Sequence, residues 1–132
     1  MLRLGVCVLL AALAGCLEAN APETVTGDWG GQHLGLVASL NGATLEYDCA
    51  TGTIAAPIRP DAMGRFSVSG EHYPGHGGPV RVDEELVRRP ARYDGVVRGT
   101  TMDLTVTLTD SNAVVGTFTL VYGQSPFVFK CV

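Results

Sequence analysis

Apolar and polar residues alternate with a period of two along most of the chain after residue 33. The clearest case is 102–109, where Met102, Leu104, Val106 and Leu108 are separated by Asp and Thr residues. Successive side chains of an extended strand point to opposite faces, so this alternation predicts strands with one buried face. The pattern predicts eight short strands, at 34–40, 43–49, 54–58, 65–73, 93–98, 102–109, 115–122 and 127–131.

Short turns separate most of these strands. Asn41-Gly42 is typical of a two-residue hairpin, and Ala50-Thr51-Gly52 and Asp110-Ser111-Asn112 are further turn sequences. The exception is 74–90, which begins with Pro, Gly and His residues and continues with mixed charges. A connection of this length in a compact domain is usually functional or mobile.

An antiparallel sheet with one apolar face must bury that face, and closing the sheet on itself also removes its exposed edges. We therefore predict an all-β domain, an eight-stranded antiparallel up-and-down barrel, with a β-sandwich as the alternative. The interior of such a barrel is filled by side chains or holds one small ligand.

The first 15 residues are expected to form an export signal. Arg3 precedes an apolar run, 4–13, that has the length of a secretory signal and is too short to span a bilayer as a permanent helix. The sequence Leu13-Ala14-Gly15-Cys16 ends this run and resembles the bacterial lipobox. The resemblance implies cleavage before Cys16 and acylation of Cys16 on its sulfur and its amine. Two alternatives are cleavage after Ala19-Asn20-Ala21, which leaves Pro22 as a poor first residue, and a short uncleaved anchor.

This interpretation divides the chain into a signal peptide (1–15), a lipidated tether (16–26) and a barrel domain (27–132). Two or more acyl chains hold a protein stably on a membrane. The expected location is the bacterial cell envelope. Leu17, rather than aspartate, follows Cys16, which favours the periplasmic face of the outer membrane in a Gram-negative cell.

The chain has four cysteines. Cys7 lies in the signal and Cys16 is the lipidation site, so Cys49 and Cys131 remain as a pair in an oxidising compartment. We predict a disulfide between them, and two free thiols are the alternative. Glu46 and Asp48 precede Cys49, an acidic setting that is the opposite of what a catalytic thiolate requires.

Composition narrows the function further. The chain carries 9 Lys and Arg against 13 Asp and Glu and has no basic run, which argues against a nucleic-acid partner. The serines lie in no nucleophile-elbow sequence, and the adjacent carboxylates of 83–85 are typical of a solvated surface. The three histidines lack a metal-ligand spacing. We therefore predict no catalytic residue, no metal and no cofactor. Separately, His72, His76 and Arg81, in or next to the long connection, are the candidate residues of a binding loop.

Short motifs resemble known envelope proteins. Gly27-Asp28-Trp29 resembles the Gly-x-Trp opening of lipocalins and other calycins, which implies that Trp29 closes the barrel base against a cation near the last strand. This chain offers Lys130 there, is shorter than most lipocalins and lacks their C-terminal helix. Tyr47-Asp48-Cys49 with Gly52 resembles the start of membrane-bound lysozyme inhibitors, but their inhibitory loop is missing here. The Gly-x-Trp opening is also similar to that of periplasmic metalloprotease inhibitors.

As a whole, the chain resembles small exported bacterial proteins that open on Trp-Gly-Gly-x-His, a resemblance that implies no function. The sequence thus predicts a non-enzymatic, lipid-anchored envelope protein that binds a small apolar ligand or a protein partner. The alternative is an inhibitor of an envelope-active hydrolase, a lysozyme or a protease, that acts through loop 74–90.

Overall fold

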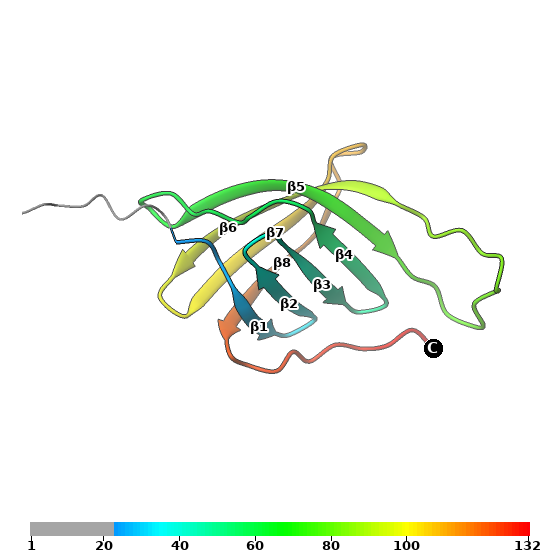
Figure 1. Cartoon of the computed structure of the whole chain (residues 1–132). Coiled ribbons are helices and arrows are strands. Elements are labelled where there is room, and N and C mark those ends of the chain that lie inside the picture. The colour runs from blue at the N-terminus through cyan, green and yellow to red at the C-terminus, as the bar shows by residue number, and fades with distance from the viewer. Residues whose placement is uncertain (1–22) are drawn as a thin grey trace, which may run out of the picture.

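The computed structural model describes residues 23–132, and these residues form a closed antiparallel β-barrel (Figure 1). Each strand pairs with the next along the chain, and the last pairs with the first, so the predicted eight-stranded up-and-down barrel is confirmed. The strands are β1 (Gly27–Gly31), β2 (Leu34–Ser39), β3 (Gly42–Tyr47), β4 (Ala50–Ile54), β5 (Arg65–Pro74), β6 (Arg89–Arg98), β7 (Thr101–Leu108) and β8 (Val114–Tyr122).

Inward-facing side chains fill the barrel. Every second residue of β7 is buried, as the alternation predicts. The same holds for β2, in which Leu34, Leu36 and Ala38 are buried. Tyr93 of β6 is the largest of the fully buried side chains and belongs to this core. Among residues 23–132, the buried hydrophobic residues all fall between Val25 and Leu120, and the closed barrel leaves no free sheet edge.

The barrel closes at a short seam between β1 and β8. Only two residue pairs join these strands, Trp29 with Tyr122 and Gly30 with Val121. Gly31 is required for this closure, because a Cβ atom at that position would overlap the carbonyl oxygen of Thr119 in β8.

An up-and-down barrel brings alternate connections to the same end. We call one end the mouth; it carries the turns at 32–33, 48–49 and 109–113 and the long loop 75–88. We call the other end the base, where the described chain begins. There the Val25 N–H donates to the carbonyl oxygen of Ile58 at 2.8 Å, and Val25 is buried in the core. Figure 1 shows loop 75–88 and the C-terminus at one end and residue 23 at the other.

The C-terminal tail, residues 123–132, leaves β8 at the base and returns along the outside of the barrel to the mouth (Figure 1). Backbone bonds join Phe127 to Gly31 and His33, and the Cys49 N–H donates to the carbonyl oxygen of Phe129 at 3.0 Å. The predicted disulfide between Cys49 and Cys131 is confirmed, with a Cα–Cα distance of 4.5 Å.

The prediction of eight strands was right in number but wrong in three places. Gly27–Gly31, expected only to open the domain, is a strand, whereas 127–131 is not. The strand expected at 54–58 lies instead at Ala50–Ile54, and the turn before it is formed by Asp48 and Cys49, with Cys49 at a φ of 47°. The cysteines therefore lie in a turn and in the tail, not on strands.

Candidate functional site

The mouth of the barrel contains a pocket of about 500 Å³. Four parts of the chain meet there: the β1–β2 turn, the β3–β4 turn, the end of β5 and the start of β8. The lining residues are His33, Tyr47, Asp48, Cys49, Ala50, His72, Pro74, Val115, Gly116 and Phe118. We refer to this site as the mouth pocket.

Aromatic rings form much of the wall of the mouth pocket. The Tyr47 ring meets the His72 ring edge to face, with centroids 5.0 Å apart and an interplanar angle of 80°. It meets the Phe118 ring in a similar way at 5.8 Å and 65°. Offset and edge-to-face pairs of this kind fix ring orientation, so the three strands β3, β5 and β8 hold a preformed aromatic surface.

Two polar atoms behind this surface, the Tyr47 hydroxyl oxygen and Nδ1 of His72, are buried and have no close hydrogen-bond partner of good geometry among the described residues. Both side chains are buried, with 5% and 6% of their surface exposed. The Tyr93 hydroxyl donates to the carbonyl oxygen of Glu71 at 2.8 Å, and its oxygen is still able to accept a hydrogen bond from the neighbouring Tyr47 hydroxyl. An unpaired buried polar group costs about 1–3 kcal/mol, and Nδ1 of His72 is the clearer case of the two.

Burial keeps both groups uncharged. It raises the pKa of Tyr47 far above its ordinary value, and the neighbouring Tyr93 phenol adds to this effect. Burial also lowers the pKa of His72, and the positive charge of Arg89 lowers it further. At neutral pH the wall of the mouth pocket therefore presents a protonated phenol and a neutral imidazole.

The rim of the pocket is charged and tied to the tail. Nδ1 of His33 lies 2.5 Å from Oδ2 of Asp48, and the Phe129 N–H donates to Oδ1 of the same carboxylate at 2.7 Å. His33 is solvent-exposed and Asp48 is half-buried. The Cys49–Cys131 disulfide lies beside this pair and fixes the tail against the rim.

The residues predicted as one binding loop are divided by the structure. His72 lies within β5 and faces the barrel interior, whereas His76 and Arg81 lie in loop 75–88. In that loop Nε2 of His76 pairs with the carboxylate of Glu84, which also accepts the Arg81 N–H at 3.2 Å. A hydrogen bond to the Gly77 carbonyl, together with Glu84, raises the pKa of His76.

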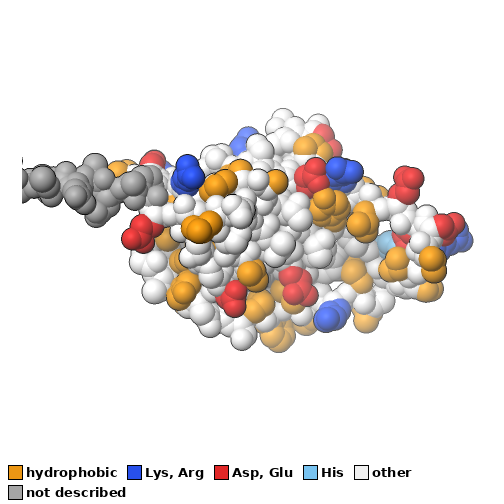
Figure 2. Space-filling view, in the orientation of Figure 1, with side chains coloured by type: hydrophobic (Ala, Val, Ile, Leu, Met, Phe, Trp, Pro, Cys, Tyr) orange, Lys and Arg blue, Asp and Glu red, His pale blue; other side chains and the backbone are white. Residues whose placement is uncertain are grey.

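Loop 75–88 extends away from the barrel and exposes several apolar side chains (Figures 1 and 2). They include Val80, Val82, Leu86 and Val87, each more than half exposed. Its exit is held by an ion pair between Arg88 and Glu71 with a separation of 3.5 Å. The loop is therefore a protruding, partly apolar surface next to the mouth pocket.

Trp29, the residue predicted to close the barrel base, is buried on β1. Its indole N–H donates to the Thr26 carbonyl oxygen at 3.1 Å, and its ring packs edge to face on Tyr122 at 5.3 Å. Lys130, the cation suggested by the calycin resemblance, lies instead in the tail between Phe129 and Cys131, which are both bonded to the mouth turn.

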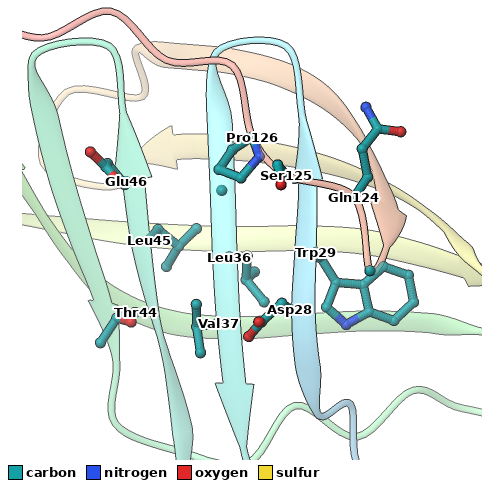
Figure 3. A pocket seen from close by; sticks show the side chains of 12 residues that line it. Asp28, Trp29, Leu36, Val37, Thr44, Leu45, Glu46, Gln124, Ser125 and Pro126 are labelled. Atoms are coloured by element: carbon teal, nitrogen blue, oxygen red, sulfur yellow. The ribbon is translucent and has the colours of Figure 1, made fainter.

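A second cavity, of about 290 Å³, lies outside the barrel wall, between the start of the tail and β1–β3. Figure 3 shows Ser125 and Pro126 of the tail beside β2, with Trp29 and Asp28 on β1. None of the unpaired buried polar atoms of the described chain lies here. The mouth pocket is the larger of the two and has a wall of three aromatic rings, so it is the stronger candidate site.

Within residues 23–132, no group of three or more His, Cys, Asp or Glu side chains is placed to hold a metal ion. The same part of the chain contains no helix that is long and apolar enough to cross a membrane. Residues 1–22, which include the predicted signal peptide and the lipidation site Cys16, lie outside the described residues. Comparisons with protein-family models, curated proteins and solved structures found no match to this chain.

The mouth pocket was not predicted from the sequence, although the sequence indicates that several of its residues face the barrel interior. Alternation already placed Tyr47 and Phe118 on inward faces, and the same parity counted from Phe66 along β5 puts His72 inward. The level of each residue along the barrel axis depends on the pairing register, which brings Tyr47, His72 and Phe118 together from three strands.

Proposed function

We propose that this chain is a non-enzymatic binding protein of the bacterial cell envelope, anchored by lipid at Cys16, which binds a small apolar ligand in the mouth pocket. The lipobox-like sequence supports the anchor, and the disulfide fits an oxidising compartment. The observation that carries the binding function is the aromatic wall of Tyr47, His72 and Phe118 around an open pocket of about 500 Å³. Ligand sites are commonly concave, mostly apolar, and supplied with a few polar groups.

The arrangement of the two ends also supports this function. The described chain begins at the base, whereas the pocket opens at the mouth. A protein held through its N-terminus would thus keep the pocket directed away from the attachment point and accessible to ligands.

A pair of neighbouring substitutions on β8 tests the proposal. Val115 lines the pocket and is partly buried, whereas Val114 does not line it and is 62% exposed. The domain of residues 23–132, with its disulfide formed, should increase the fluorescence of the neutral apolar dye N-phenyl-1-naphthylamine. Val115→Arg should abolish this increase and Val114→Arg should preserve it. Equal dye responses in both variants, or no response of the unmodified domain, would contradict binding in the mouth pocket.

The second candidate is inhibition of an envelope-active hydrolase through loop 75–88. It is favoured by the exposed apolar residues of the protruding loop, above all Val82 and Leu86. If it is correct, the domain should inhibit a lysozyme or a periplasmic protease, and Val82→Asp should remove the inhibition while dye binding in the mouth pocket is retained. Inhibition that survives both Val82→Asp and Leu86→Asp would exclude the loop as the inhibitory element.

A further inference from the structure

The base of the barrel presents apolar side chains to solvent. It carries the connections 40–41, 55–64 and 99–100. Leu40 in the first of these is 68% exposed, and Met63 in the second is 73% exposed. Neither residue belongs to the core, so burial within the barrel does not account for a large apolar side chain at the tip of either turn.

A shallow apolar hollow lies next to Leu40, at the base ends of β2, β3 and β4. It has a volume of about 450 Å³, and no charged residue lines it. Its aliphatic lining consists of Val37, Ala38, Ala43, Ile54 and Ala55. Ala55 also begins the connection that carries Met63. Single exposed apolar residues are common on proteins, but an exposed apolar area that extends over several elements indicates contact with a partner or a membrane.

Both turns hold their apolar tips in place through local hydrogen bonds. In the first turn, the Asn41 N–H donates to Oγ of Ser39 at 3.2 Å. In the second turn, Oδ1 of Asp61 accepts the N–H groups of Met63 and Arg65 at 2.8 and 2.9 Å. Ordered turns lose little conformational entropy when they meet a surface, so the base is already shaped for such a contact.

Charge is distributed unevenly between the two ends of the barrel. The only charged residues in the three base connections are Arg59 and Asp61. Loop 75–88 at the mouth, in contrast, carries Arg81, Asp83, Glu84, Glu85 and Arg88. Removing charged groups from water is costly, so the base suits an apolar environment and the mouth does not.

The chain enters the barrel at this same end. The Val25 N–H donates to the carbonyl oxygen of Ile58, in the connection that carries Met63, and Figure 1 shows this connection next to the start of the described chain. Cys16 precedes Glu23 by seven residues, and even a fully extended chain of this length spans at most about 25 Å. A lipid on Cys16 would therefore hold the base within about 25 Å of the bilayer.

We propose that the base of the barrel docks onto the surface of a lipid bilayer, with Leu40 and Met63 inserted between the headgroups. This inference rests on the proposed lipid anchor at Cys16 and goes beyond it, because an anchor at one point leaves the orientation of the barrel free. Contact through the base fixes that orientation and directs the mouth pocket away from the membrane.

A single acyl chain tests this contact, because one chain alone gives only weak and reversible membrane binding. Residues 16–132 contain the whole closed barrel and its core. In this chain the Cys16 thiol reacts with N-tetradecylmaleimide, whereas the disulfide protects Cys49 and Cys131. Binding to neutral phosphatidylcholine vesicles is measured by sedimentation. The double variant Leu40→Asp with Met63→Asp should lower the partition coefficient by at least about tenfold, because two apolar contacts are replaced by carboxylates that resist insertion.

The double variant Val80→Asp with Val114→Asp is the matched control. These two residues lie at the mouth and are 72% and 62% exposed. The control therefore adds the same charge and removes a similar apolar surface at the opposite end of the barrel. Its partition coefficient should stay close to that of the unmodified chain. Thermal unfolding of both double variants checks that the barrel is intact.

Three results would overturn docking through the base. They are an unchanged partition coefficient in the Leu40→Asp, Met63→Asp variant, an equal or greater loss in the control variant, and a dimer without vesicles that the base substitutions dissociate. The dimer would assign the base to a second copy of the chain. Dye binding in the mouth pocket and the processing of Cys16→Ala test the binding function and the anchor separately, so failure of the docking is distinguished from failure of either.

Discussion

The disulfide between Cys49 and Cys131 should make a large contribution to the stability of the barrel. The two residues are 82 positions apart, so the bond closes a loop that contains β4 to β8. For a loop of this length, the chain-entropy model gives a loss of unfolded-state entropy worth about 4.5 kcal/mol at 25 °C. Domains of this size have free energies of unfolding of about 5–15 kcal/mol, so the effect is a large share of the total.

The perturbation is the double variant Cys49→Ala with Cys131→Ala. Backbone bonds from the tail to Gly31, His33 and Cys49 remain available, so the barrel should still fold. We expect the free energy of unfolding to fall by about 4 kcal/mol and the melting temperature by about 15 °C. Thermal and urea unfolding followed by circular dichroism measure both values. Lys130→Ala is the matched control, since it alters an exposed residue of the same tail and keeps the disulfide.

Amide hydrogen exchange shows where the stability is lost. The His33 and Cys49 amides donate to carbonyl oxygens of the tail, at 2.7 and 3.0 Å. In the double variant these amides should exchange faster, because the tail detaches locally before the barrel unfolds. A loss of stability below about 1 kcal/mol, or full protection of both amides, would refute the view that the disulfide holds the tail to the mouth.

Further predictions concern the core, pH and processing. Tyr93→Phe should lower the free energy of unfolding by about 1 kcal/mol in urea titrations, because the hydroxyl bond to Glu71 is lost. Gly70→Ala should cost about 1–3 kcal/mol in the same assay, since its Cβ would lie 2.3 Å from the Thr53 carbonyl oxygen and 2.7 Å from the Tyr93 ring. The pKa of His72 is lowered on folding, so protonation favours the unfolded chain; stability should be full above the ordinary value of 6.5 and fall below it, with a shallower pH dependence in His72→Phe. Cys16→Ala should leave unprocessed, unlipidated precursor on immunoblots and in metabolic labelling with palmitate, and normal processing would exclude the lipobox.

The sequence by itself determined which face of most strands is buried. Met102, Leu104 and Val106 are fully buried, as their alternation predicts, because the two-residue period of a strand is a local property of the backbone. The sequence also determined the disulfide, once the other two cysteines were assigned to the export signal.

Only the tertiary structure decided which segments close the barrel. The first strand, Gly27–Gly31, is mostly glycine and has no apolar alternation, so its role depends on the close approach to β8 that glycine permits. The segment 127–131 has the alternation of a strand, yet Phe127 and Phe129 bond to the mouth turns and remain half exposed. A segment becomes a strand only when another segment pairs with it. The alternation within one segment does not show which other segment will lie beside it.

The mouth pocket likewise depends on tertiary structure. Inward orientation of Tyr47 and Phe118 follows from parity along each strand, but their meeting with His72 depends on the register between strands that are distant in the sequence. The burial of His72 Nδ1 without a close hydrogen-bond partner among the described residues is likewise a property of the packed barrel. The local sequence shows which side chains are polar. Whether such a side chain is buried and hydrogen-bonded depends on all the residues packed around it, so only the folded structure decides this.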